Sequence, residues 1–270
     1  MDTIKEKYKV KKAILVVSFG TSYAETRKKT IDRIEREICE AYPDIPVFRA
    51  WTSRMILKKL KMRDGIHFDN VDEAMERMEE NHIREVIVQP THVMNGIEND
   101  VMIEDVLKYR DRFDKIVFGQ PLLTSIQDSM DVAEAVMAEF SNLSRDEALV
   151  FMGHGTPHHA NAVYAALDDI FKNRHYDNVF VGTVEGYPEL LDVMKMVKKG
   201  DYRKVHLAPL MLVAGDHAAK DMSGDGKESW KSCFEAEGYD VECHLKGLGE
   251  YPGIRKIFLK HLENAVNGGE

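Results

Sequence analysis

Two histidines, His154 and His217, each stand shortly after an apolar, strand-like run, at 148–152 and 205–213, and Glu185 follows a third such run. In an open α/β sheet, the loops that leave the C-terminal strand ends form the ligand crevice. Two imidazoles and one carboxylate that meet there would hold a divalent transition metal and leave coordination positions open for a substrate. The sequence therefore predicts that these three side chains form one metal site.

The loop around His154 is built from residues that permit a tight turn. Gly153 and Gly155 flank the histidine, so the backbone can turn sharply and a large planar ligand can approach closely. Pro157 suits the first turn of a helix, which places the imidazole between a strand end and a helix start. The alternative is a polar loop histidine without a role.

The other two loops carry acids whose roles can be separated. Glu185 would add negative charge that favours a dication, and the alternative is a solvated loop acid. Asp221 lies four residues after His217, so on a helix it could orient the imidazole. Asp216 fits an ordinary helix start, where acids complement the helix dipole.

The elements that must position these residues alternate along the whole chain. Short apolar runs predict strands near 13–19, 46–51, 84–92, 115–119, 148–153, 178–184, 204–213 and 240–245. Amphipathic patterns predict helices near 22–41, 53–62, 71–81, 98–112, 124–140, 159–173, 188–199, 216–237 and 253–266. This alternation is typical of βαβ units and predicts an α/β fold with parallel sheets.

The two halves of the sequence resemble each other. Residues 13–21 read like 148–156, an apolar strand that ends in Gly-Thr before a helix, and 86–96 read like 205–215. We therefore expect an internal duplication: two similar α/β domains that face each other across a central cleft. The alternative is a chance likeness between ordinary α/β strands.

The polar stretch SNLSRDE at 141–147 is the expected junction, which gives domains at 1–143 and 144–270. In the first domain, Phe19 stands where the second has His154, so the matching loops are expected to wall the cleft and contact substrate. The expected substrate-contacting residues are Phe19, Gly20, Thr21, His92, Glu98 and Gly155. His92 is open between a metal ligand and a hydrogen-bonded structural histidine. The remaining histidines are expected on the surface or in strands, outside that cleft: His67, His82, His175, His206, His244 and His261.

Composition excludes several function classes. A net charge of −9 over 270 residues argues against a nucleic-acid partner, which would favour a basic patch. No apolar run approaches the roughly 18 residues that a membrane span needs. Three scattered cysteines and an N-terminus without an apolar leader predict a reduced, cytoplasmic setting. The sequence is compatible with a monomer or a homo-oligomer.

Nucleotide-binding signatures are also missing. The pattern Gly153-x-Gly155 lacks its third glycine because His158 stands there, and the segment 223–227 is not a P-loop because position 221 is Asp. We therefore expect no nucleotide cofactor.

Several motifs in combination resemble a known family. They are SFGTS at 18–22, PTHVMNGIE at 90–98, GHGT at 153–156, VEGYP at 184–188 and GDHAAKDM at 215–222. Together they cover nearly the whole chain and resemble the CbiK-type sirohydrochlorin cobaltochelatases of the class II chelatase family. The chain departs from the family pattern at Ile97, which stands before Glu98.

The resemblance implies a class II chelatase fold and an ATP-independent insertion of Co²⁺ into sirohydrochlorin in anaerobic cobalamin biosynthesis. It implies that His154, Glu185 and His217 hold the metal. Because a neutral imidazole is also a base with a pKa near neutrality, we expect His154 and His217 to be catalytic, at least one of them by accepting pyrrole protons. Co²⁺ and the tetrapyrrole would both be substrates, and some Lys or Arg should meet the tetrapyrrole carboxylates, with Arg54 and Lys220 as candidates together with Lys227. Alternatives are a chelatase for Fe²⁺ or Ni²⁺ and a two-lobed binding protein without turnover.

Overall fold

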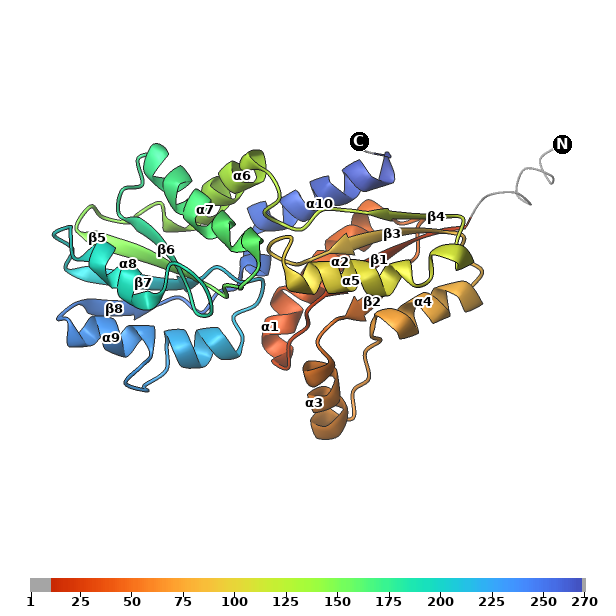
Figure 1. The fold of residues 1–270 in the computed structure, drawn as a ribbon, viewed down its shortest axis with the longest axis horizontal. Helices are drawn as coiled ribbons and strands as arrows, with labels where there is room; N and C mark the ends of the chain where they lie inside the picture. The colour runs from red at the N-terminus through yellow and green to blue at the C-terminus, as the bar shows by residue number, and fades with distance from the viewer. Residues whose placement is uncertain (1–10, 269–270) are drawn as a thin grey trace.

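The computed structural model describes residues 11–268. They form two α/β halves that lie side by side, each built on one parallel sheet (Figure 1). The strands are β1 (Lys12–Ser18), β2 (Val47–Trp51), β3 (Glu85–Pro90), β4 (Lys115–Phe118), β5 (Glu147–Gly153), β6 (Val179–Thr183), β7 (Lys204–Pro209) and β8 (Asp240–Cys243). Each predicted strand is present. The N-terminal residues on which the leader expectation rests lie outside the described part.

The two sheets share one topology. The first has the order β2-β1-β3-β4 and the second β6-β5-β7-β8, with every pair parallel. Strand for strand, the second order repeats the first. The predicted fold class of two similar parallel-sheet domains is therefore confirmed, and the identical order supports the duplication.

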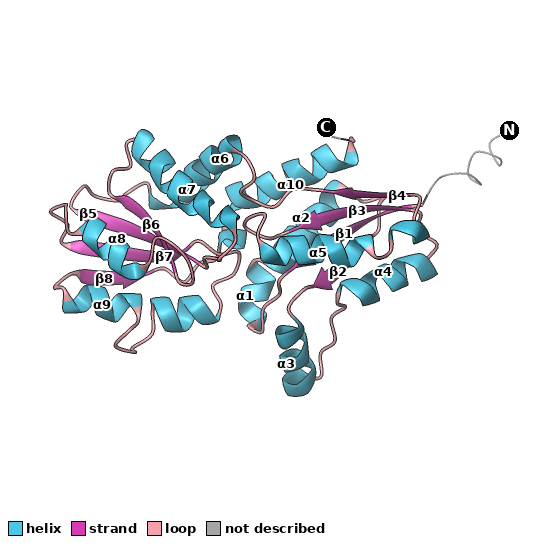
Figure 2. Cartoon of the chain, in the orientation of Figure 1, coloured by secondary structure: helices cyan, strands magenta, loops and turns pink. Residues whose placement is uncertain are grey.

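Helices cover both faces of each sheet (Figure 2). They are α1 (Ala24–Lys29), α2 (Ile31–Ala41), α3 (Arg54–Asp64), α4 (Val71–Glu80), α5 (Ile97–Leu107), α6 (Ile126–Met137), α7 (Ala162–Asn173), α8 (Leu190–Val197), α9 (Trp230–Ala236) and α10 (Pro252–Val266). Short turns of helix complete the set: η2 (Arg110–Arg112), η3 (Ala138–Phe140), η4 (His159–Asn161), η5 (Ala218–Met222) and η6 (Leu248–Glu250).

The central strands β1 and β5 are almost entirely apolar because both of their faces are buried, as is usual for parallel sheets. In β1, Ile14 and Val16 point into one core cluster, whereas Leu15 and Val17 point into another. The first cluster continues through α2, α6, α7 and α10 into the second sheet. One apolar core therefore joins the two halves.

The last helix of the chain returns to the first sheet. α10 packs on β3, β4 and α2 and pairs with α6, which itself packs on α7 of the second half. The buried Arg255 of α10 fixes this arrangement, because it donates to Glu37 Oε1 at 2.9 Å and to the carbonyl of Glu250 at 2.8 Å. The chain thus crosses between the halves at α6 and again at α10, and the boundary at 143 stays a prediction.

Two predicted helices are interrupted. The helix expected at 22–41 breaks at Thr30, whose backbone leaves the helical region (φ −115°, ψ −88°) and whose hydroxyl donates to the carbonyl of Thr26 at 2.6 Å. The helix expected at 216–237 becomes the π-helical turn η5, a loop, and α9. Gly224 permits that break, because a Cβ there would lie 2.4 Å from the carbonyl oxygen of Lys220.

Candidate metal centre

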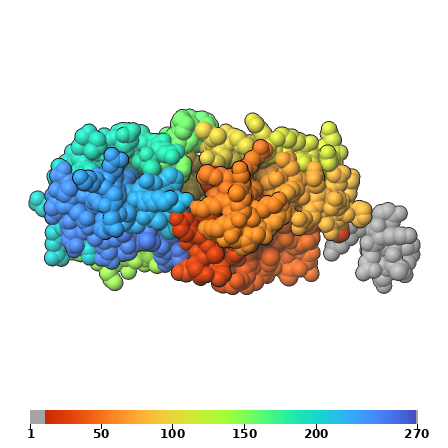
Figure 3. Space-filling model, turned by 90° about the horizontal axis from the view of Figure 1, so that it is seen from below, coloured from red at the N-terminus to blue at the C-terminus, as the bar shows by residue number. Residues whose placement is uncertain are grey.

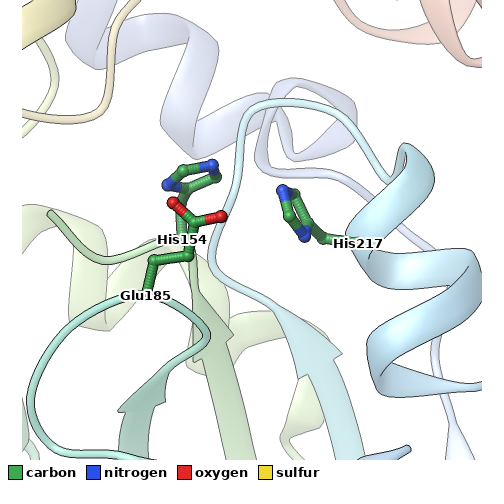
Figure 4. A group of neighbouring side chains, drawn as sticks. All are labelled: His154, Glu185 and His217. Carbon is green, nitrogen blue, oxygen red and sulfur yellow. The ribbon is translucent and has the colours of Figure 1, made fainter.

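His154, Glu185 and His217 meet at the C-terminal edge of the second sheet (Figure 4). They follow β5, β6 and β7, which are neighbours in the order β6-β5-β7. One nitrogen of each imidazole and one carboxylate oxygen lie within 4.8 Å of one another, and the two rings are nearly perpendicular, with centroids 4.8 Å apart. The structure thus brings together the three side chains that the sequence analysis paired with a metal.

Hydrogen bonds fix which ring nitrogen faces the shared space. His217 Nδ1 lies 2.7 Å from a carboxylate oxygen of Asp221, and His154 Nδ1 lies 2.9 Å from the carbonyl oxygen of Gly155. Because both partners are acceptors, each Nδ1 carries a proton, so in the neutral form of either ring the lone pair is on Nε2. Neutral imidazoles with a free Nε2 and an oriented ring are the form that binds a metal ion.

The glycines beside His154 are required by close packing. A Cβ on Gly153 would lie 2.3 Å from the ring of Tyr164, whose pKa is raised to about 12 by burial. Gly155 has φ +83°, and a Cβ on it would lie 2.4 Å from the backbone nitrogen of Gly186. The amide of Glu185 donates to the carbonyl of His154 at 2.7 Å. These contacts hold the loops of His154 and Glu185 together.

The three side chains line a cavity of about 510 Å³ to which both halves contribute. Figure 3 shows the face where the red and orange first half meets the blue second half. All residues expected to contact substrate line the cavity: Phe19, Gly20, Thr21, His92, Glu98 and Gly155. Apolar side chains form much of the remaining wall, including Met55, Ile56, Val93, Leu210, Leu212 and Val213.

His92 lies in the cavity wall and outside the group of three. Its Nδ1 is 3.3 Å from the side-chain oxygen of Asn99, and burial lowers the pKa of its imidazole. Its Nε2 is buried without a hydrogen-bond partner in the structure. Of the two readings left open by the sequence, the geometry favours the hydrogen-bonded histidine.

Sequence reasoning missed a contact across the cleft. The hydroxyl of Tyr23 donates to Asp216 Oδ1 at 2.7 Å, which lowers the pKa of Asp216 and raises that of Tyr23. Lys59 lies 4.0 Å from the same carboxylate and lines the cavity. The three cations suggested earlier, Arg54, Lys220 and Lys227, are not among the lining residues. No local pattern could pair residues that lie 193 positions apart.

Comparison with known proteins decides the family. A family model described as "Cobalt chelatase (CbiK)" matches residues 12–267. The chain belongs to the CbiK cobalt chelatase family. This CbiK-family chain is 42% identical over 258 residues to the sirohydrochlorin cobaltochelatase of Salmonella typhimurium, a match that covers 96% of this chain and 97% of that protein. It is 35% identical to sirohydrochlorin cobaltochelatase CbiKC of Nitratidesulfovibrio vulgaris, over 95% of this chain and 91% of the relative.

Solved structures agree on the fold. SirB from Bacillus subtilis with Fe³⁺ superposes with a TM-score of 0.65 at 15% identity, covering 96% of the CbiK-family chain and 97% of SirB. The sirohydrochlorin chelatase SirB in complex with cobalt gives 0.64 at 14% identity, with 95% and 96% covered. The expected class II chelatase architecture is confirmed. Within residues 11–268, no helix of this CbiK-family chain has the length and apolarity that a membrane crossing needs.

Proposed function

We propose that this chain is a sirohydrochlorin cobaltochelatase that inserts Co²⁺ into sirohydrochlorin in anaerobic cobalamin biosynthesis, without a nucleotide. The observation that carries the proposal is the convergence of His154, Glu185 and His217 in a cleft large enough for a planar ligand. The 42% identity to a sirohydrochlorin cobaltochelatase over nearly the whole chain supports the substrate and the metal.

The donor set suits a metal that must be bound and then released. Two imidazole nitrogens and one carboxylate oxygen bind Co²⁺ but leave coordination positions free for the nitrogens of the macrocycle. As pyrrole nitrogens replace the protein ligands, the metal passes from the three side chains to the tetrapyrrole. A complete protein cage would hold the ion too well to give it up.

Insertion also releases two protons from the pyrrole nitrogens. We assign their acceptance to His154 and His217, because a neutral imidazole has a lone pair that takes a proton once it no longer holds metal. The carboxylate of Asp221 would stabilise a protonated His217 through their 2.7 Å contact. Two protons leave the macrocycle and one dication enters it, so the net charge of the tetrapyrrole is the same before and after insertion.

The cleft fits the rest of the substrate. Apolar walls match the faces of a tetrapyrrole, and Lys59 supplies a cation for one of its carboxylates. Three free cysteines, without a disulfide among residues 11–268, support work in a reducing cytoplasm. We further propose that no nucleic acid or membrane takes part, and that the chain acts alone or as a homo-oligomer.

A visible-absorption assay of Co²⁺ insertion tests the proposal. Wild type should insert cobalt well above the uncatalysed rate, whereas His154→Ala and His217→Ala should lose most of that rate and keep their circular dichroism. Glu185→Gln should bind Co²⁺ more weakly and insert it more slowly. His67→Ala, at an exposed position outside the cavity lining, is the matched control. Unchanged insertion by both active-site histidine variants would refute the assignment, and binding without turnover by wild type would make the chain a binding protein. Faster insertion of Fe²⁺ or Ni²⁺ than of Co²⁺ would show that the proposed substrate metal is wrong.

A further inference from the structure

A second group of metal-binding side chains lies on the second sheet, outside the cleft. It consists of His206 in β7, Glu242 in β8 and His244 just after β8. None of the three lines the cavity. His206 is the third residue of β7, whereas the cleft lies beyond the last residue of that strand. Both histidines lie in or beside a strand and outside the cleft, as expected from the sequence, but the structure also places them next to each other.

The pairing follows from strand register. His206 stands opposite Glu242 in the parallel β7–β8 ladder. Successive side chains in a strand alternate between faces, so His244 lies on the same face as Glu242. The intervening Cys243 packs into the core on the other face, together with Val241. The sheet itself therefore gathers two imidazoles and one carboxylate.

The distances suit a single ion. His206 Nδ1 lies 3.0 Å from His244 Nε2. Glu242 Oε2 lies 3.8 Å from His206 Nδ1, and Glu242 Oε1 lies 3.8 Å from His244 Nε2. A tetrahedral site with bonds of about 2.1 Å has ligand atoms about 3.4 Å apart. One ion therefore fits between the two nitrogens and the Glu242 carboxylate after small side-chain adjustments, with one or both carboxylate oxygens as ligands.

A carboxylate and an aromatic ring lie beside the two imidazoles. On the far side of the His206 ring, Nε2 is buried and makes no hydrogen bond, and a carboxylate oxygen of Glu147 lies 3.4 Å from it. A carboxylate behind the outer nitrogen of a metal-bound imidazole is the usual supporting arrangement, because it fixes the proton there. Phe140 packs edge-on against the ring of His244, with centroids 5.2 Å apart.

We infer that His206, Glu242 and His244 form a second divalent transition-metal site, which ties the edge strand β8 to β7. Two nitrogen donors and one carboxylate favour Co²⁺, Ni²⁺ or Zn²⁺ over Mg²⁺ or Ca²⁺. The site is independent of the chelatase reaction, because it shares no residue with the cleft. Its role is to hold the four-residue edge strand in the sheet.

One group competes with the metal for the carboxylate. Lys204 Nζ lies 2.5 Å from an oxygen of Glu242, and this hydrogen bond must yield when a dication binds. Replacing Lys204 with Met removes the competitor without touching a ligand. Lys204→Met should therefore bind metal more tightly, which a merely structural role of the histidines would not produce.

The test uses the full chain with the cleft ligands removed. The His154→Ala/His217→Ala protein is dialysed against Zn²⁺ or Co²⁺, and bound metal and melting temperature are measured. We expect one equivalent of metal, a visible Co²⁺ spectrum of a four- or five-coordinate ion, and a higher melting temperature with metal. Adding His244→Asn or His206→Asn should abolish all three, and adding Lys204→Met should lower the dissociation constant several-fold.

A control covers the remaining group of this kind among the described residues, His67, Asp69 and Glu73. Adding His67→Asn should leave the retained equivalent in place. The inference is overturned if the cleft variant binds no metal, or if its bound metal survives both His206→Asn and His244→Asn. It is also overturned if Lys204→Met does not tighten binding. Melting temperatures without metal show whether each variant is folded.

Discussion

The substitution Gly155→Ala tests whether the packing between the His154 loop and the Glu185 loop matters for metal binding, because it leaves all three proposed ligands in place. Gly155 has φ +83°, where an L-residue is strained. Its added Cβ would lie 2.4 Å from the nitrogen of Gly186 and 2.8 Å from the carbonyl carbon of Glu185. Both are backbone atoms, so no flexible side chain can move aside. Relief requires the Glu185 loop to move away from His154.

The expected cost has two parts. Left-handed backbone conformation costs an alanine about 1–2 kcal/mol, and overpacking against fixed atoms costs about 1–3 kcal/mol. The free energy of unfolding should therefore fall by about 2–5 kcal/mol. Because the displaced loop carries Glu185, Co²⁺ affinity should also fall, by about 10–100-fold, as it does when groups that orient ligands are disturbed.

Substitutions at two other glycines separate the cost of backbone strain from the cost of overpacking. Gly65 has φ +67° with nothing within 4 Å of its Cβ position, so Gly65→Ala reports conformational strain alone. Gly226 has neither a positive φ nor a close neighbour, so Gly226→Ala should stay within about 1 kcal/mol of wild type. Urea unfolding and Co²⁺ titration of the three variants give the comparison. If Gly155→Ala is no less stable than Gly65→Ala and binds Co²⁺ as wild type does, the packing argument is wrong.

Three further changes test other parts of the structure. Asp221→Asn should weaken Co²⁺ binding about 10–100-fold by loosening the His217 ring, with unchanged stability; equal affinity in a Co²⁺ titration would contradict this. Because burial lowers the pKa of His92 in the folded state, its contribution to stability is complete above the unfolded pKa near 6.5 and is lost as the pH falls below it. His92→Gln should therefore lose less stability than wild type between about pH 7 and pH 5, and parallel urea-unfolding profiles would exclude the effect. Arg255→Met should destabilise the fold by about 1–3 kcal/mol because it leaves the carbonyl of Glu250 without its buried donor and the partly buried Glu37 carboxylate without one of its two cations; unchanged urea unfolding would refute this role.

The strands and the convergence of His154, Glu185 and His217 could be predicted from the sequence for the same reason. The central parallel strands are buried on both faces, so they give continuous apolar runs such as 148–152, and a polar residue just past such a run falls at the C-terminal edge of the sheet. His154, Glu185 and His217 follow adjacent strands, which brings them together without any long-range information.

Other features depend on packing between distant segments. The break at Thr30 and the loop after η5 lie inside amphipathic patterns, where periodicity alone predicts one helix. The bond between Tyr23 and Asp216 exists only because the two halves face each other. The pairing of His206 with His244 depends on the β7–β8 register, which two short strands do not reveal. Sequence reasoning thus finds what one strand end determines, and misses what two elements determine jointly.

The return of α10 to the first sheet has a consequence for synthesis on the ribosome. The first sheet is complete once β4 is made, but α10, which covers part of it, ends about 150 residues later. At a synthesis rate of about 5–20 residues per second, the apolar surface that α10 covers stays exposed for roughly 8–30 s. The first half therefore cannot complete its core before α10 has been synthesised. The nascent chain should be a chaperone client during that interval, and release of the last helix should trigger closure of the shared core.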